Sequence, residues 1–203
     1  MLRSLVLCLV ATTAGCTLNR PETAQPVSYD FGPQPAYTRT NAGIHGALLI
    51  PQVAAPSWLD EEQILYRLLY QDNARPQSYS MSRWTAEPAA LLTDRLRSRF
   101  AAVSGGVVAP GYGARSDYTL RVELEDFSQS FTQPEESRVT LRARASLLGT
   151  QERTLIAQQV FNVERAAAPN APGAVKGLTE AADAFVEALV AWTVQNARRE
   201  KVK

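Results

Sequence analysis

Polar and apolar residues alternate strictly along two stretches in the second half of the chain. Apolar side chains occupy every second position from Tyr118 to Leu124 and from Val139 to Leu147, and the positions between them are mostly polar or charged. A third stretch, from Leu155 to Val163, follows the same pattern less regularly. A period of two is typical of strands with one packed face and one wet face, so we expect an antiparallel sheet here.

The wet face of this predicted sheet carries opposite charges on neighbouring strands. Glu123 and Glu125 lie on the first strand, and Arg142 and Arg144 lie on the second. Cross-strand ion pairs of this kind contribute roughly 0.2–1 kcal/mol each. We interpret the pattern as a solvated sheet face rather than a binding site.

Shorter apolar runs predict further strands in the first half of the chain. The run from Gly46 to Val53 is bounded by Gly and Pro and is expected to be a strand. The run from Ile64 to Tyr70 is compatible with helix or strand, but its aromatic content and the turn residues after it favour a strand. Residues Ser78 to Trp84 would then pair back on it as a hairpin.

Two segments have a helical period instead. From Pro88 to Val103, apolar residues recur at helical spacing, with Thr85 as a candidate cap and Gly105-Gly106 as the expected stop. The segment from Lys176 to Arg198 has an apolar stripe, formed by Leu178, Ala182, Phe185, Leu189 and Trp192. We expect this stripe to cover the packed face of the sheet, and a coiled-coil partner is the alternative. Together the patterns predict an α/β (α+β) fold with helices packed on one face of an antiparallel sheet.

The first sixteen residues have the layout of a secretory signal peptide. A basic start with Arg3 precedes the apolar run Leu5 to Ala11, which is far shorter than the roughly 20 residues needed to span a bilayer. The following Ala14-Gly15-Cys16 resembles a bacterial lipobox, which implies a diacylglycerol and an N-acyl chain on Cys16 after cleavage. The alternative is an ordinary secreted protein that is cut nearby.

The residue after the cysteine, Thr17, implies by the same resemblance that the protein is sorted to the outer membrane of a Gram-negative cell, on its periplasmic face. Residues 17–28 are polar, contain two prolines and show no apolar periodicity, which is typical of a flexible tether. The predicted organisation is a signal peptide at 1–15, the lipidated cysteine and tether at 16–28, a single α/β domain at 29–199 and a basic tail at 200–203.

Composition excludes several classes of function. The 203-residue chain has 21 basic and 20 acidic side chains, so it lacks the charge excess of a nucleic-acid-binding protein. His45 is the single histidine, and the two cysteines, Cys8 and Cys16, lie too near the N-terminus to complete a zinc site. The sequence has neither a Gly-x-Ser-x-Gly elbow nor a phosphate-loop motif, and Glu135-Glu136 is expected in a loop. We therefore predict no enzyme, no metal and no cofactor beyond the covalent lipid.

Aromatic side chains cluster in two places. The predicted hairpin holds Tyr66, Tyr70, Tyr79 and Trp84, and Phe127 and Phe131 are expected to flank a polar loop. Buried aromatic residues usually belong to a core, and the alternative is a surface for a partner or for lipid, where Tyr, Trp and Arg are enriched.

The stretch from Ile50 to Phe100 resembles a known family. It contains Ile-Pro-Gln-Val-Ala-Ala-Pro-Ser-Trp-Leu-Asp from Ile50, then Leu-Tyr-Arg-Leu-Leu-Tyr from Leu65, and Tyr-Ser-Met-Ser-Arg-Trp from Tyr79. These motifs resemble the ABC-type transport auxiliary lipoprotein family, also called PqiC/YmbA-like. The resemblance implies a fold similar to the TolB amino-terminal domain. It also implies a partnership with an MCE-domain protein and its ABC permease complex in intermembrane lipid transport.

The resemblance leads to a hypothesis for the partner-binding residues, namely Tyr66, Arg67, Tyr79, Arg83, Trp84, Phe127 and Phe131. These residues are expected either to contact the MCE protein or to form the structural centre of the hairpin. Two other functions stay open at this stage. One is a lipid- or glycolipid-binding envelope lipoprotein that acts on its own, and the other is a structural TolB-like interaction module. Homo-oligomerisation is also left open.

Overall fold

The computed structural model describes residues 25–39, 43–111, 113–150 and 154–200, and the side chains of these ranges up to residue 197. Within these ranges the chain forms one sheet of eight strands and two helices. In chain order they are β1 (Val27–Tyr29), β2 (Ile44–Leu49), β3 (Gln63–Leu68), β4 (Gln77–Trp84), α1 (Pro88–Ala101), β5 (Ser104–Val108), β6 (Tyr118–Gln133), β7 (Glu136–Gly149), β8 (Thr154–Ala167) and α2 (Ala171–Glu200).

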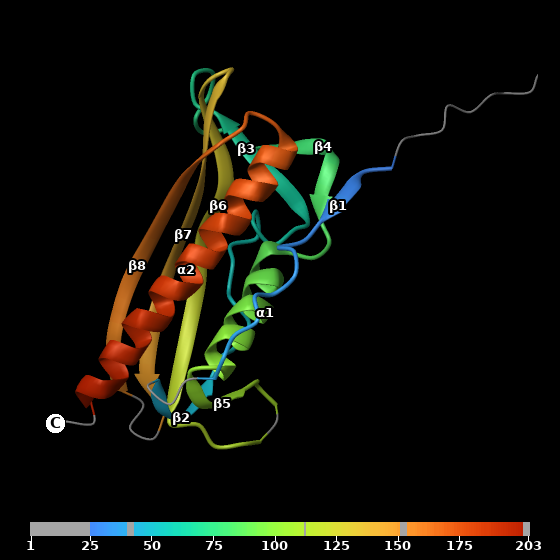
Figure 1. Ribbon diagram of the computed structural model, residues 1–203. Coiled ribbons are helices and arrows are strands. Elements are labelled where there is room, and N and C mark those ends of the chain that lie inside the picture. The colour runs from blue at the N-terminus through green and yellow to red at the C-terminus, as the bar shows by residue number, and fades with distance from the viewer. Residues whose placement is uncertain (1–24, 40–42, 112, 151–153, 201–203) are drawn as a thin grey trace, which may run out of the picture.

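The long strand β6 organises the sheet. One of its edges pairs antiparallel with β7, which in turn pairs antiparallel with β8. Its other edge is shared, because β2 pairs with Tyr118 and Thr119 whereas β3 pairs with Ser128 to Phe131. Ala54 bridges to Glu123 between these two pairings. The sheet therefore branches from β6, with β5 beside β2 at one end and β4 and β1 beside β3 at the other (Figure 1).

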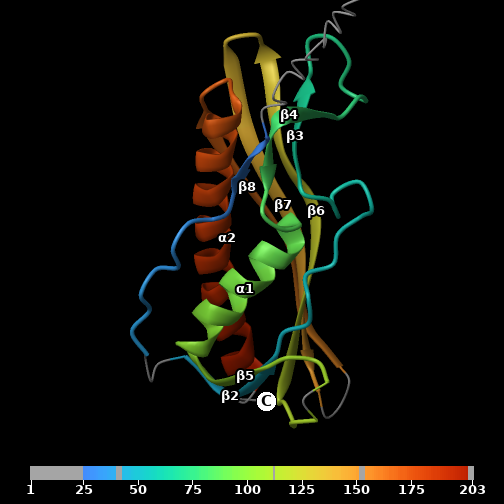
Figure 2. The ribbon, with the colours of Figure 1, turned by 90° about the vertical axis from the view of Figure 1, so that its right-hand side faces the viewer.

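Both helices pack on the same face of the sheet, as predicted (Figure 2). Leu178, Phe185 and Leu189 of α2 are fully buried, so the predicted stripe covers the sheet rather than a coiled-coil partner. Leu92 and Phe100 of α1 are also fully buried, and they complete a single hydrophobic core between the helices and the sheet. The predicted α+β class is confirmed.

The sheet is mixed, however, and not antiparallel throughout. Four pairings are parallel, namely β1 with β4, β2 with β5, β2 with β6, and β3 with β6. Alternation along a strand shows which face each side chain takes, but it carries no information about the direction of the neighbouring strand. The predicted β3–β4 hairpin is antiparallel and is confirmed.

A bulge in β6 changes the phase of its alternation. The register with β7 shifts between Leu124 and Asp126, so Leu124 and Phe127 both face the core although they are three residues apart. The strand then continues to Gln133, and Phe131 is buried within it. The expectation that Phe127 and Phe131 flank a loop is therefore wrong, because the inserted residue hides the continuation of the strand in the sequence pattern.

Two boundaries around α1 also differ from the sequence-based expectation. Thr85 does not cap the helix, since Glu87 is the N-cap residue and makes no side-chain capping bond. The helix ends at Ala101, and Gly105 and Gly106 lie in β5 rather than in a turn. A Cβ atom at Gly105 would lie 2.9 Å from the Gly46 carbonyl oxygen, so glycine permits the close approach of β2 and β5.

The start of the described chain is more ordered than a tether. Val27 and Ser28 belong to β1 and pair with Ser82 and Arg83 of β4, so the predicted tether extends too far by these two residues. Similarly, β2 begins at Ile44 and ends before Pro51, which shifts the expected strand towards the N-terminus. The predicted signal peptide, Cys16 and residues 201–203 of the basic tail lie outside the described residues.

Candidate interaction surface

Two of the predicted partner-binding residues belong to a buried aromatic cluster. The rings of Phe31, Trp84 and Phe127 contact one another with centroid distances of 5.5 to 5.7 Å. Trp84 is 1% exposed and Phe127 is 2% exposed. A partner cannot reach these side chains in the folded protein, so the hypothesis that they form a contact surface is wrong and they belong to the core.

A second cluster joins the β3–β4 hairpin to β6. The Tyr66 ring lies 4.8 Å from the Tyr79 ring and 5.9 Å from the Phe131 ring, measured between centroids. The Tyr79 hydroxyl donates a hydrogen bond of 2.6 Å to Oε1 of the buried Gln129. Burial, followed by the charge of Tyr66, raises the pKa of Tyr79 to about 12. The two half-buried tyrosines therefore fasten the hairpin to the sheet, and Phe131, also buried, is not a surface residue.

The two remaining predicted residues, Arg67 and Arg83, are accessible. Arg83 is exposed, and its Nε donates to the Ser28 hydroxyl at 3.2 Å while Nη1 lies 3.7 Å from a Glu62 carboxylate oxygen. These contacts link β1 to β4 and to the segment before β3. Arg67 is partly buried, and its guanidinium carbon lies 5.4 Å from the centre of the Trp58 ring.

Trp58 is one of the exposed large apolar residues on the described part of the molecule. It is 39% exposed and lies in a tight turn in which the Leu59 amide donates to the Pro56 carbonyl at 2.8 Å. Arg67 stacks on it, and Nη1 of Arg67 also donates to the Asn73 carbonyl at 3.3 Å. Trp58 lies within the motif that begins at Ile50, but it is not among the residues predicted to contact a partner.

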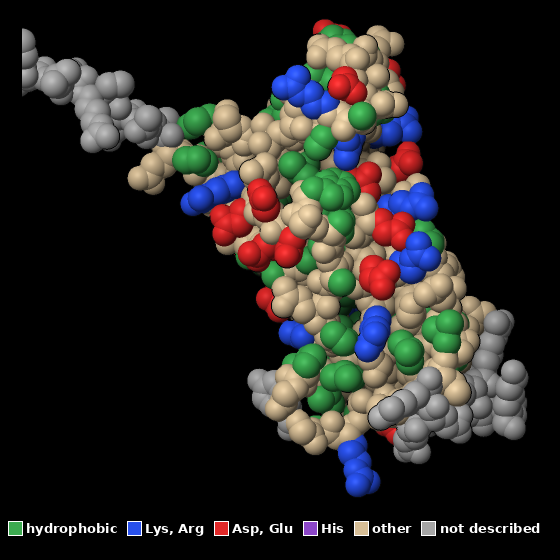
Figure 3. Space-filling model, turned by 180° about the vertical axis from the view of Figure 1, so that it is seen from behind, with side chains coloured by type: hydrophobic (Ala, Val, Ile, Leu, Met, Phe, Trp, Pro, Cys, Tyr) green, Lys and Arg blue, Asp and Glu red, His purple; other side chains and the backbone are tan. Residues whose placement is uncertain are grey.

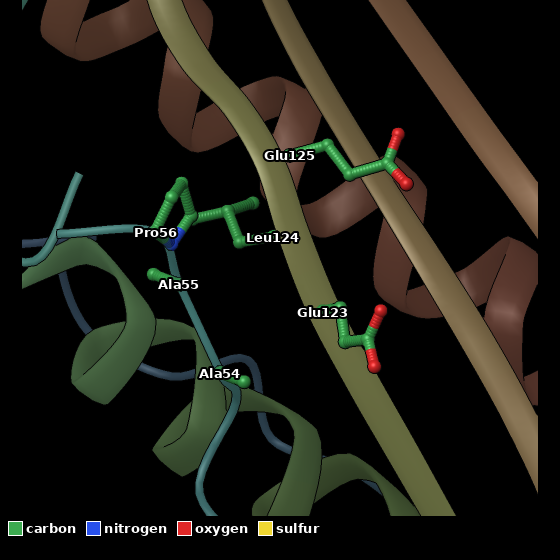
Figure 4. Close-up of a pocket in the computed structure, with 6 residues that line it drawn as sticks. All are labelled: Ala54, Ala55, Pro56, Glu123, Leu124 and Glu125. Atoms are coloured by element: carbon green, nitrogen blue, oxygen red, sulfur yellow. The ribbon is translucent and has the colours of Figure 1, made fainter. Parts of the chain in front are cut away.

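A shallow hollow of about 440 Å³ lies beside this turn (Figure 4). Its apolar lining comes from Ala54, Ala55, Pro56 and Leu124. The two carboxylates that border it, on Glu123 and Glu125, point away from Pro56 (Figure 4). The floor of the hollow is therefore apolar, and charge is confined to one side.

The predicted ion pairs occupy this charged side. Glu125 accepts hydrogen bonds from Arg142 Nε at 2.8 Å and from Arg144 Nη2 at 2.7 Å. These bonds, first that of Arg142 and then that of Arg144, lower the pKa of Glu125. Glu123 lies farther from Arg144, at 3.8 Å. The cross-strand pairs are thus confirmed, and positive and negative side chains intermingle on the face away from the helices (Figure 3).

We call this region the outer-face patch, and we define it as Pro56, Trp58, Arg67, Glu125 and the hollow of Figure 4. It combines an exposed tryptophan, a stacked arginine, a small apolar depression and a rim of paired charges. Protein interfaces commonly have this composition, with an aromatic or apolar centre and a polar rim.

The opposite side of the molecule holds a buried arginine that is not among the residues predicted from the sequence. Arg95 of α1 is 2% exposed and donates hydrogen bonds to the carbonyls of Phe31 and Pro33, the second at 3.2 Å. Its Nε lies 3.3 Å from Asp183 Oδ1 of α2, close enough for an ion pair, although that oxygen makes no hydrogen bond. Arg95 therefore holds the segment after β1 against both helices. Arg95, Arg97 and Arg99 stand at every second position of α1, so the sequence pattern does not show which of them is buried.

A second arginine continues this attachment. Arg99 forms a bidentate pair with Glu187 of α2, with distances of 2.6 and 3.0 Å. Its guanidinium carbon also lies 4.8 Å from the centre of the Tyr37 ring. The chain between β1 and β2 is thus fastened at Phe31, Pro33 and Tyr37.

The described residues contain no group of three or more His, Cys, Asp or Glu side chains arranged to hold a metal ion. His45 lies exposed on β2. No helix among these ranges is long and apolar enough to cross a membrane.

Comparison with known proteins adds a family and a set of similar folds. The family model described as the ABC-type transport auxiliary lipoprotein component matches residues 29–190. No curated protein matches the chain. Three solved structures have a similar fold.

The first is protein XCC0632 from Xanthomonas campestris, with 19% identity and a TM-score of 0.71, covering 88% of this chain and 98% of that one. The second is an uncharacterized protein with 17% identity and a TM-score of 0.63, covering 83% and 99%. The third is the hypothetical protein CT253 from Chlamydia trachomatis, with 8% identity and a TM-score of 0.53, covering 75% and 98%. At these identities the likeness concerns the fold alone.

Proposed function

Because the chain belongs to the ABC-type transport auxiliary lipoprotein family, we propose that it is a non-catalytic outer-membrane lipoprotein that docks a periplasmic MCE assembly. In this function, Cys16 carries the acyl chains, the residues after it connect the anchor to β1, and the folded domain binds the partner. The partner would be an MCE-domain protein linked to an ABC permease complex, which supplies the energy for intermembrane lipid transport.

The family match over residues 29–190 is the observation that carries this proposal. The lipobox-like Ala14-Gly15-Cys16 supports the membrane anchor. Two or three acyl chains hold a protein stably at a bilayer, whereas one chain does not. The Thr17 that follows the cysteine supports the outer membrane as the destination.

Within the domain, we place the docking site at the outer-face patch. Trp58 and Arg67 are accessible there, in contrast to the buried Trp84 and Phe127. The neighbouring hollow has room for an apolar side chain of a partner, and the paired charges at its border can rearrange to meet polar groups at the rim. Loss of Trp58 would remove the largest apolar contact of the patch.

Co-purification with the MCE-domain protein of the same cell tests both levels of the proposal. We expect the wild-type chain to capture that protein, and the double variant Trp58→Ser/Arg67→Ala to capture at least tenfold less while keeping its thermal stability. The matched control is Arg138→Ala/Glu164→Ala, which removes an exposed ion pair from the same face of the sheet and should leave capture unchanged.

The outcomes separate the function from the surface. If the wild-type chain captures no MCE-domain protein, the docking function is wrong. If both double variants capture as well as the wild type, the function stands but the outer-face patch is not the docking site. Native mass spectrometry of the purified chain checks the alternative of a lipid carrier. A co-purified lipid that is lost on Ala54→Arg, a change at an exposed residue that lines the hollow, would assign the hollow to lipid instead.

A further inference from the structure

Four of the seven exposed large apolar residues in the described part of the chain belong to one branch of the sheet, and the other three are Trp58 and, on β8, Leu155 and Val160. Leu69 and Tyr70, in the turn between β3 and β4, are 42% and 44% exposed, and Met81 of β4 and Val27 of β1 are 47% and 54% exposed. All four belong to the branch of the sheet formed by β3, β4 and β1. Figures 1 and 2 both place this branch in the upper half of the molecule, with the β3–β4 turn at its upper end.

The same branch receives the anchored end of the chain. Val27 pairs with Ser82, next to Met81, so the described chain begins beside β4. Residue 25 is nine positions after Cys16, and at about 3.3 Å per position this length of chain reaches at most about 30 Å. If Cys16 is acylated, this end of the domain must therefore lie within that distance of the bilayer surface.

Hydrogen bonds hold the backbone of the β3–β4 turn in a conformation that leaves its apolar side chains exposed. The Leu68 carbonyl accepts hydrogen bonds from the amides of Gln71 and Asp72, at 3.0 and 2.9 Å, and the Leu69 amide donates to β6. Asp72 in turn accepts a hydrogen bond from the Ala74 amide at 2.9 Å. These bonds fix the backbone around Leu69 and Tyr70, and a fixed turn inserts such side chains into a surface at little cost in conformational entropy.

We propose that the β3–β4 turn is a membrane-contacting tip, in which Leu69 and Tyr70 enter the interfacial layer of the bilayer that holds the Cys16 acyl chains. This inference rests on the proposed lipid anchor. Tyrosine is enriched at the membrane–water interface because its ring is apolar and its hydroxyl is polar. The contact orients the domain and leaves the outer-face patch, on the side of the sheet, accessible to a partner.

Positive and negative side chains are mixed near the tip, so the proposed contact is apolar and not electrostatic. Arg75 lies in the same turn as Asp72. The neighbouring β6–β7 turn carries the exposed Glu135, and the exposed Glu136 begins β7. A surface with this balance gains nothing from anionic lipids, whose attraction depends on clustered Lys and Arg. We therefore expect the contact to be insensitive to lipid charge and to salt.

Depth-dependent fluorescence quenching on the full-length lipidated protein tests the tip. If the signal peptide with Cys8 is removed and Cys16 is acylated, a single introduced cysteine is the one reactive thiol. An environment-sensitive label is attached to the cysteine of the Tyr70→Cys variant. The matched control carries the label on Leu155→Cys, because Leu155 is 58% exposed and lies at the opposite end of the sheet. The probe membrane is a phosphatidylcholine vesicle that contains lipids with a quencher at the level of the upper acyl chain.

We expect the label at position 70 to be quenched at least threefold more than the label at position 155, equally with and without anionic lipid. Equal quenching at both positions, on protein whose acylation is verified by mass spectrometry, would overturn the tip. Protection of position 70 only after addition of an MCE-domain protein would also overturn it, in favour of a protein occupant. A chain that lacks acyl groups would refute the anchor separately. On the mature chain with Cys16→Ser, mixed with excess vesicles, the label at position 70 must still be quenched more than the label at position 155.

Discussion

Replacement of the buried Arg95 by methionine is expected to destabilise the domain strongly, although the residue lies far from the proposed contacts. Methionine fills much of the same volume but cannot donate hydrogen bonds. The carbonyls of Phe31 and Pro33 would then lose their guanidinium donor. An unsatisfied buried polar group costs about 1–3 kcal/mol, and the saved desolvation of the guanidinium offsets part of this loss. We expect the free energy of unfolding to fall by about 2–4 kcal/mol.

The partner carboxylate provides the matched control. The Asp183 side chain is 41% exposed. Burial raises its pKa, the charge of Arg95 partly opposes this shift, and the charge of Glu187 adds to it. A raised pKa means that the folded state disfavours the charged form of Asp183. The negative charge therefore lowers stability at neutral pH, and this effect disappears below the pKa values of the folded and unfolded states. Asp183→Asn should therefore be neutral or slightly stabilising at pH 7, and any gain should vanish as the pH falls.

Urea unfolding of the two variants at pH 7 measures the difference, and hydrogen exchange shows where it acts. Arg95→Met should lose protection mainly in the segment from Phe31 to Tyr37, because that segment depends on the arginine. Equal losses of stability in the two variants would refute this reasoning. It would mean that the Arg95–Asp183 ion pair, and not the bonds to the carbonyls, stabilises the segment.

Three further predictions concern other described contacts. Phe127→Ala should lower the free energy of unfolding by about 3–5 kcal/mol in urea, because it empties the centre of the aromatic cluster; a loss below 1 kcal/mol would contradict its burial. Glu125→Gln should reduce stability by less than about 1 kcal/mol at pH 7, and the difference from wild type should disappear as the pH falls through the lowered pKa of Glu125, where the bonds from Arg142 and Arg144 are lost in both proteins. The hydroxyl of Tyr79 should stay protonated up to about pH 12, and an ultraviolet titration that detects ionisation of every tyrosine near pH 10 would disprove its burial.

The sequence predicted the elements whose pattern is uninterrupted. The strict alternation from Val139 to Leu147 places β7 correctly, and the stripe through Leu178 and Phe185 identifies the face of α2 that covers the sheet. The pattern was misleading where a backbone irregularity intervened. The bulge after Leu124 reverses the phase of β6 and made Phe127 look like part of a loop.

The candidate site was predicted less well, for a different reason. Tyr, Trp and Arg are enriched both in cores and in interfaces, so residue type alone cannot separate Trp84, which is buried, from Trp58, which is exposed. The same limit applies to Arg95, which is buried, and Arg97, which lies two residues later on the same helix and is only partly buried. Tertiary packing decides these cases, and one sequence contains no direct record of it.

The parallel pairing of β1 with β4 has a mechanical consequence. A lipoprotein held at one end by a membrane and at the other by a large assembly experiences tension along its N-terminal chain. The tension would act along β1, perpendicular to its hydrogen bonds with β4, so those bonds would share the load instead of breaking one after another. Within β1, the hydrogen bond from Arg83 to Ser28 would resist the same pull, and after β1 the contact of Arg95 with Phe31 would do so as well. With the proposed anchor on Cys16, the short first strand would carry the load between the membrane and the body of the protein.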